Sequence, residues 1–200
     1  MKKTLEEILQ ELAAKLAELG CDKLYNIVGP SGSGKSTLTF AIQKALKEMK
    51  AKRGLTPVES MTTRPPRYPG EPGHVYVTKE EFDKHEMVAY TKFDGNEYGV
   101  PASMLDECDL YVIDIEGVKT LRERYSGKQL VVIYLDITPE EAARRMRVRG
   151  DSEEKIQKRL ANDAVMFADM EGLAADYIVD ANRTEDEVLA SLCSIIIDTL

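Results

Sequence analysis

The residues from Gly29 to Ser36 read GPSGSGKS, and their types and spacing suit the binding of a phosphate chain. A glycine, four residues and then Gly34, Lys35 and Ser36 allow backbone N–H groups to point inward without Cβ clashes. The lysine can reach the β- and γ-phosphates of a nucleotide, and the serine hydroxyl can ligate Mg²⁺. The pattern predicts a nucleoside triphosphate site formed by Gly29, Pro30, Ser31, Gly32, Ser33, Gly34, Lys35, Ser36 and Thr37.

The flanking residues must hold this loop in place. Residues 24–28 read as a short buried strand, and the apolar positions between residues 38 and 49 have the spacing of an amphipathic helix. The helix would offer its positive N-terminal end to the phosphates. The alternative is a Gly/Ser-rich turn with an incidental lysine, and the order strand, loop, helix favours the phosphate site.

Composition limits the classes of protein to which the chain can belong. Its 200 residues, 43% hydrophobic and 31% charged, suit one globular domain. The sequence contains neither a run of roughly 18 apolar residues nor a secretory signal, so no membrane partner is expected. A net charge of -8 argues against binding to nucleic acid, because a phosphate backbone requires a basic surface. Three scattered cysteines predict neither disulfides nor zinc, so the cytoplasm is the expected location.

Other stretches predict the remaining core. An apolar stripe predicts a helix over residues 4–19, closed by Gly20, which would pack on the core or on a second subunit in a homodimer. Short strands are expected at residues 55–59, 110–116, 130–135 and 177–179. Thr184 and Glu187 form a capping box that predicts the start of a terminal helix.

Two arginines lie in a proline-rich stretch that cannot be helical throughout, SMTTRPPRYPGE at residues 60–71. Arg64 and Arg67 on a stiffened loop could clamp a phosphate, although such a stretch is by itself more often a solvated loop. Together with the phosphate-binding loop, the stretch resembles the guanylate kinase family. The matching residues are Ser60, Thr62, Thr63, Arg64, Arg67, Gly70 and Glu71.

The resemblance covers about residues 24–190. It implies that Tyr98 in GNEYG contacts the phosphate of the acceptor, and that Arg145, Arg149 and Arg159 belong to a lid over the donor phosphates. Residues 180–182 lie where the family contacts adenine. Asp114 and Glu116 follow an apolar run and are candidates for binding magnesium, and Asp114 also for binding the acceptor. A carboxylate at this place can instead cap the next helix.

Two departures from the family concern the acceptor base. Ala89 stands where the family has a guanine-reading glutamate, and Val100 replaces a small polar residue. Alanine accepts no hydrogen bond, so weaker discrimination for GMP is expected, with Ala89→Glu improving it if the pocket has room. Ser60 and Asp114 are retained as base contacts, and His74 occupies the position of a tyrosine.

The sequence therefore predicts a three-layer α/β fold of the P-loop NTPase class with a parallel central sheet. One domain over residues 1–200 would contain a core (21–59, 102–140 and 160–200), an acceptor-binding insertion (60–101), a lid (141–159) and an N-terminal helix (1–20). The expected activity is transfer of the γ-phosphoryl group of ATP, with Mg²⁺, to a nucleoside monophosphate. Lys35, Arg145, Arg149 and Arg159 would neutralise charge. A kinase of another base, a sugar-phosphate kinase and a non-catalytic interaction module are the alternatives.

Overall fold

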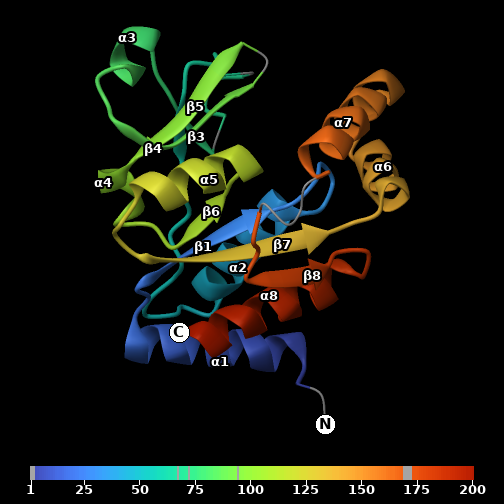
Figure 1. Cartoon of the computed structure of the whole chain (residues 1–200). Helices are drawn as coiled ribbons and strands as arrows, with labels where there is room; N and C mark the ends of the chain where they lie inside the picture. Colours follow the sequence, from blue (N-terminus) through green and yellow to red (C-terminus); the bar gives the residue numbers. More distant parts are fainter. Residues whose placement is uncertain (1–2, 67, 72, 94, 169–172) are drawn as a thin grey trace.

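The computed structural model describes residues 3–66, 68–71, 73–93, 95–168 and 173–200. In the described chain, a parallel central sheet lies between two groups of helices, and a second sheet lies beyond one of these groups (Figure 1). This arrangement confirms the three-layer α/β fold with a parallel central sheet that the sequence predicts.

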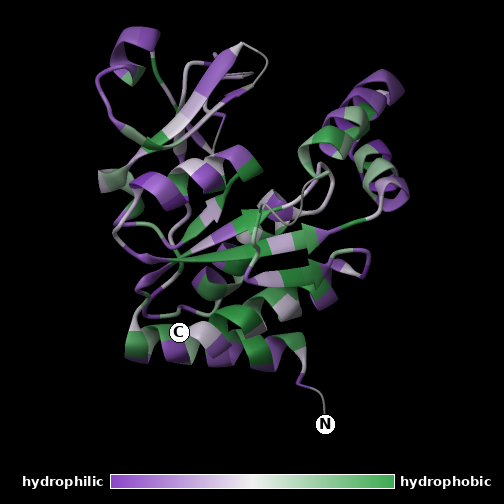
Figure 2. Ribbon diagram, in the orientation of Figure 1, coloured by the Kyte–Doolittle hydropathy of each residue, from purple (hydrophilic) through white to green (hydrophobic). Residues whose placement is uncertain are grey.

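The central sheet has the strand order β6-β1-β7-β8, and every neighbouring pair is parallel. Its strands are β1 (Lys23–Val28), β6 (Leu110–Val112), β7 (Gln129–Asp136) and β8 (Tyr177–Asp180). β1 and β7 are nearly continuous apolar runs, because helices cover both of their faces (Figure 2). The loop after β1 therefore starts from the buried centre of the sheet.

One face of this sheet packs against α1 (Leu5–Leu19), α2 (Lys35–Glu48) and α8 (Glu185–Thr199) (Figure 1). The helices α1 and α8 begin at the capping boxes of Thr4 and Thr184, and Gly20 ends α1 as predicted. Because α1 shares its apolar stripe with α8, the first of the two alternatives holds and α1 packs on the core.

The opposite face is covered by α4 (Ala102–Leu105) and α5 (Ile115–Arg124), whose buried side chains join a second apolar cluster. Beyond α5 lies a sheet of order β3-β2-β5-β4 (Figure 1). Its strands are β2 (Ser60–Thr62), β3 (His74–Tyr76), β4 (Met87–Phe93) and β5 (Asn96–Pro101), with α3 (Lys79–Phe82) between β3 and β4. This sheet carries most of the acceptor residues that the sequence predicts.

Two charged helices project from the end of β7 (Figure 2): α6 (Pro139–Val148) and α7 (Glu153–Met166). Thr138 and Ser152 cap them, and acidic residues fill their first turns, as the helix dipole favours. Ile156 is the buried residue among those described in α7. This helix is therefore held by few apolar contacts.

The strand expected at residues 55–59 is wrong for the described chain. Pro57 forms an isolated parallel bridge with Leu110, and the N–H of Val58 donates to the carbonyl of Leu110 over 2.8 Å. Proline has no N–H to donate, so a ladder cannot continue through this position. The strand expected over residues 110–116 ends early, at Val112, since Asp114 caps α5.

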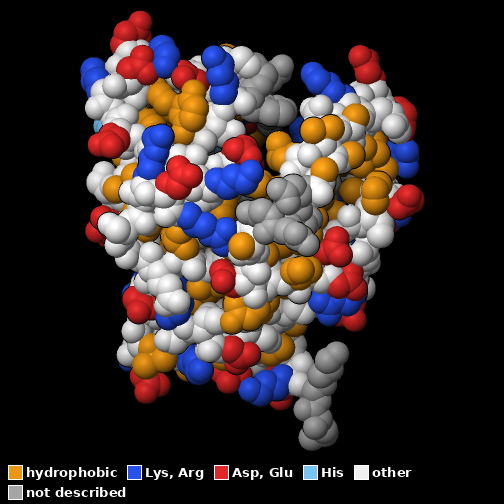
Figure 3. All heavy atoms as spheres, viewed as in Figure 1, with side chains coloured by type: hydrophobic (Ala, Val, Ile, Leu, Met, Phe, Trp, Pro, Cys, Tyr) orange, Lys and Arg blue, Asp and Glu red, His pale blue; other side chains and the backbone are white. Residues whose placement is uncertain are grey.

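No helix among the described residues is both long and apolar enough to span a membrane. On the face in Figure 3, acidic and basic side chains are interspersed, and no continuous basic surface is visible there.

Candidate active site

The loop between β1 and α2 has the backbone geometry that phosphate binding requires. Gly32 and Gly34 have φ values of 79° and 96°, in the left-handed region that favours glycine. A Cβ at Gly32 would also lie 2.8 Å from the carbonyl oxygen of Ala142, so the loop packs directly against α6. Helix α2 begins at Lys35, which points its N-terminal N–H groups toward the loop.

Lys35 lies half-buried beneath this loop. Its Nζ donates to the carbonyl oxygens of Gly29 and Pro30 over 2.6 and 2.9 Å. The pKa of Lys35 is lowered to about 8: burial is the largest cause, Arg159 and Arg149 add to the lowering, and the negative charge of Asp163 opposes it. The ammonium group is therefore close to its titration range at neutral pH, and a bound phosphate would favour its charged form.

A cavity of about 870 Å³ opens over the loop. Its lining residues include the lid candidates Arg145, Arg149 and Arg159, so the structure brings these predicted arginines together. Arg145 donates to Glu141 and to the carbonyl oxygens of Ala181 and Arg183, which joins α6 to the segment after β8. The cavity can hold a polyanionic nucleotide between the loop and these arginines.

A second cavity, of about 290 Å³, lies between the two sheets. The predicted acceptor residues Ser60, His74, Tyr98 and Asp114 all line it. Ser60 Oγ lies 2.9 Å from His74 Nδ1, and the ring centroids of His74 and Tyr98 are 5.5 Å apart. His74, predicted to stand in for a tyrosine, therefore takes part in the polar edge of this cavity.

Asp114 caps α5 and also lines this second cavity. Its carboxylate accepts a 2.7 Å hydrogen bond from the N–H of Gly117, which is the capping alternative. Burial raises the pKa of Asp114 above its usual range, while the hydrogen bond from the N–H of Gly117 and the nearby Thr91 side chain oppose this rise. One carboxylate thus caps a helix and faces a ligand cavity.

Of the two arginines in the predicted phosphate clamp, the structure describes Arg64. Both terminal nitrogens of Arg64 donate to the Glu71 carboxylate, at 3.2 and 3.0 Å, and one of them also donates to the Tyr76 hydroxyl. These contacts raise the pKa of Arg64, so its charge is fixed. Arg67 lies outside the described residues, and its predicted contact stays a prediction.

The predicted magnesium ligands lie in different places. Ser36 lines the donor cavity and Asp114 the second cavity. In the described chain Glu116 lines neither cavity, is exposed, and pairs with Lys119 at 2.9 Å. The described residues contain no cluster of three His, Cys, Asp or Glu for a metal ion. The hard oxygen of Ser36 beside a phosphate site suits Mg²⁺, which keeps several water or phosphate ligands.

Ala89 is not among the described residues that line the second cavity. Its side chain is fully buried in the apolar cluster, where it pairs across the strands with the equally buried Val100. A longer side chain there would have to displace apolar neighbours, and the expected effect of Ala89→Glu on GMP, which requires room in the pocket, stays a prediction. Thr91, two residues along β4, lines the cavity instead.

From the sequence, Thr91 and Glu97 are alternative readers of the base if the protein is strict for GMP, and Met166, which also lines the second cavity, has no expected role. The alternation of strand residues could have indicated Thr91, because it shares a strand face with Ala89. Met166 belongs to α7, far along the chain, and no local pattern in the sequence would place it beside β4.

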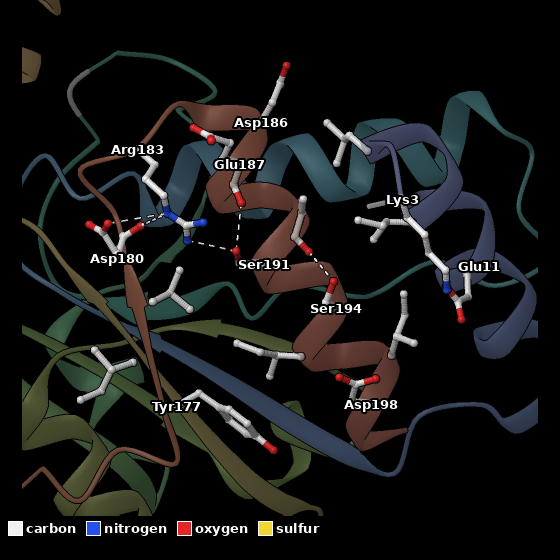
Figure 4. A pocket seen from close by; sticks show the side chains of 17 residues that line it. Lys3, Glu11, Tyr177, Asp180, Arg183, Asp186, Glu187, Ser191, Ser194 and Asp198 are labelled. Carbon is white, nitrogen blue, oxygen red and sulfur yellow. Dashed lines mark hydrogen bonds and ion pairs between the residues drawn. The ribbon is translucent and has the colours of Figure 1, made fainter. Parts of the chain in front are cut away.

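A groove of about 910 Å³ lies elsewhere, between α1, α8 and β8 (Figure 4). Its polar side chains bond with one another: Arg183 donates to the Ser191 hydroxyl at 3.0 Å, and Lys3 pairs with Glu11 at 2.6 Å. None of the glycines of the phosphate-binding loop is among the described residues that line it. The chemistry of the chain therefore centres on the two smaller cavities.

The family model and the relatives that match this chain all belong to one family. The family model for guanylate kinase matches residues 21–198. A guanylate kinase from Geobacter metallireducens is 34% identical over 172 residues, which cover 78% of this chain and 79% of the relative. Guanylate kinases from Zymomonas mobilis and Prochlorococcus marinus are 33% and 32% identical, covering 86% and 84% of this chain and 82% and 95% of the relatives.

Proposed function

We propose, because the chain belongs to the guanylate kinase family, that it is a nucleoside monophosphate kinase which transfers the γ-phosphoryl group of ATP to GMP. The observation that carries this proposal is a pair of cavities that share helix α7. Arg159 of α7 lines the cavity over the phosphate-binding loop, and Met166 of the same helix lines the acceptor cavity. A donor and an acceptor bound there would lie on either side of one helix.

At the donor side, the loop amides and Lys35 would hold the β- and γ-phosphates of ATP. Arg149 and Arg159, together with Lys35, would neutralise the charge that spreads over the transferred phosphoryl group. Arg145 is bonded to two backbone carbonyls, so it would also fix the segment beside the adenine. Phosphoryl transfer needs positioning and charge neutralisation rather than a covalent intermediate.

At the acceptor side, Arg64, Arg67 and Tyr98 would hold the phosphate of GMP, with His74 and Ser60 beside the nucleoside. Glu71 keeps the Arg64 guanidinium in one orientation through two hydrogen bonds, which suits recognition of a phosphate. An arginine fixed before the ligand binds loses less conformational freedom on binding.

The base would be read by Thr91 and Asp114. Guanine presents N–H donors on its pairing edge, and a carboxylate accepts them well. Thr91 lines the same cavity as Asp114 and opposes the rise in the Asp114 pKa that burial causes, which favours the ionised, accepting form. This pair supports GMP as the acceptor despite Ala89, because it supplies accepting oxygens from a neighbouring position.

Mg²⁺ would be held at the donor side by Ser36, the nucleotide phosphates and water, with Asp114 as a more distant candidate. The ion supplies charge neutralisation between the β- and γ-phosphates when it is bound. Ser36 lies in the first turn of α2, so its hydroxyl is presented to the donor cavity beside Lys35. The protein residues position the nucleotide for the ion rather than enclosing it.

Three further features of the sequence interpretation stay proposals. The chain would divide into a core, an acceptor-binding insertion over residues 60–101 and a lid over residues 141–159. The protein would reside in the cytoplasm, which the three free cysteines support. A homodimer stays a prediction, and light scattering of the purified protein would test it.

Initial-rate kinetics with ATP, Mg²⁺ and a set of acceptors would test the function. The proposal predicts the highest kcat/KM for GMP among GMP, AMP, UMP and CMP, and none for a sugar phosphate that lacks a base. Higher kcat/KM for another monophosphate or for a sugar phosphate would support the corresponding alternative. ATP binding without transfer to any acceptor would support an interaction module.

A further inference from the structure

One face of helix α7 contacts both cavities and the phosphate-binding loop between them. Arg159 lines the donor cavity and Met166 lines the acceptor cavity. Asp163 accepts a hydrogen bond of 2.8 Å from the backbone N–H of Ser31. Their spacing of i, i+4 and i+7 puts all three side chains on the same side of the helix. The contact with Ser31 therefore lies between the two side chains that meet the substrates.

This hydrogen bond joins parts of the molecule that are 132 residues apart in the chain. Its acceptor is a carboxylate, and charge-assisted hydrogen bonds are roughly twice as strong as neutral ones. The negative charge of Asp163 also opposes the lowering of the Lys35 pKa. Asp163 thus touches the loop that holds the donor phosphates and supports the charged state of its lysine.

The few apolar contacts of α7 give this bond its importance. Ile156 is the buried residue among those described in the helix, and it lies two turns before Asp163. Val165, beyond Asp163, is exposed. Leu160, and Phe167 at the end of α7, add partly buried apolar contacts, and the hydrogen bond to Ser31 lies between them and joins the helix to the loop.

We propose that Asp163 is a positioning residue for phosphoryl transfer. By accepting the Ser31 N–H, it sets the position of α7 on the loop, and so places Arg159 at the donor and Met166 at the acceptor. This inference rests on the proposed function and adds a residue that acts through others. A misplacement of about 1 Å at a reacting site can cost about a hundredfold in rate, so one contact of this kind matters.

Two substitutions separate the hydrogen bond from other properties of the side chain. Asp163→Ala removes the acceptor and should lower kcat about ten- to hundredfold, while the KM for GMP changes less than about threefold. Asp163→Asn keeps an oxygen that can accept the Ser31 N–H and should retain kcat within about threefold. Asn162→Ala, at an exposed neighbouring position of α7, is the matched control and should behave as wild type.

The measurements are steady-state kinetics with ATP and GMP, urea unfolding of each variant, and a double-mutant cycle with Arg159→Ala. The proposal expects unchanged unfolding midpoints and a strongly non-additive cycle, because Asp163 acts by placing Arg159. Equal kcat in wild type and Asp163→Ala would overturn this inference and leave the proposed function intact. Equal losses in Asp163→Asn and Asp163→Ala, or tighter ATP binding in both, would also overturn it, since charge would then be the decisive property.

A wild type that transfers no phosphoryl group to any monophosphate would overturn the proposed function itself. The role of Asp163 in transfer would fall with it. The two failures are therefore distinguished by the activity of the wild type alone.

Discussion

Replacing Thr91 with valine removes one hydroxyl from the acceptor cavity and keeps the shape of the side chain. In wild type Thr91 and Asp114 line the same cavity, and Thr91 opposes the rise in the Asp114 pKa that burial causes. If the two side chains read guanine together, the loss of a hydrogen bond to a charged group is worth about 1.5–3 kcal/mol. We expect kcat/KM for GMP to fall about ten- to hundredfold, while the KM for ATP stays within about twofold.

The pH dependence gives a second signature of the same pair. Asp114 must be ionised to accept N–H groups, so kcat/KM for GMP should fall at acid pH as this group becomes protonated. Thr91 lowers the pKa of Asp114, so Thr91→Val should raise that pKa and move the acid limb to higher pH. Thr91→Ser keeps the hydroxyl and should keep the limb in place.

The assay is a coupled measurement of ADP release between about pH 4.5 and 9, with GMP and AMP as acceptors. A Thr91→Val protein with wild-type kcat/KM for GMP and an unmoved acid limb would refute the reading of guanine by this pair. Equal losses for GMP and AMP would refute it as well, because the effect would then be independent of the base.

Three further outcomes follow from the site. Burial lowers the pKa of Lys35 to about 8, so kcat/KM for ATP should decline above that pH as the ammonium is lost. Lys35→Arg should lack this decline on the basic side of the pH profile. A decline that persists in the variant would belong to another group. Arg64→Ala should lower kcat/KM for GMP by a factor that corresponds to about 2–5 kcal/mol of free energy, and it should leave the KM for ATP nearly unchanged. Arg64→Lys is the milder control. Equal effects on both substrates would place Arg64 outside the acceptor site. Ala89→Glu would put a carboxylate in a fully buried apolar cluster, so it should lower the free energy of unfolding, measured by urea denaturation, by about several kcal/mol. Ala89→Ser is the smaller polar control. An unchanged unfolding midpoint would show that this position reaches solvent.

The donor site could be predicted from the sequence because it is local. The loop from Gly29 to Ser36 is contiguous, and its neighbours carry the periodicities of a strand and a helix. The glycine positions, the lysine and the hydroxyl are fixed by spacing alone. The lid arginines were placed by resemblance, and the structure brings them to the same cavity.

The acceptor site depends on strand register, which the sequence specifies less directly. The pairing of β4 with β5 is irregular between Met87 and Ala89. Ala89 and Thr91 lie two residues apart on one face of β4, so the alternation of strand residues cannot decide which of the two borders the cavity. Tertiary packing decides it, because Ala89 is buried in the apolar cluster and Thr91 lines the cavity.

Long-range contacts account for the rest of what the sequence could not reveal. Asp163 and Ser31 meet only because α6 and α7 fold back over the loop. The predicted strand at residues 55–59 failed for a local reason, because Pro57 cannot continue a ladder.

Transfer of the terminal phosphate of ATP to GMP is the central claim, and isotopic labelling tests it most directly. Wild-type protein would be incubated with Mg²⁺, ATP labelled in the γ-phosphate and unlabelled GMP, and the products separated by chromatography. We expect the label in GDP at a rate that matches ADP release, with little label in free phosphate. ADP release with the label in free phosphate alone, or no loss of label from ATP, would contradict the claim.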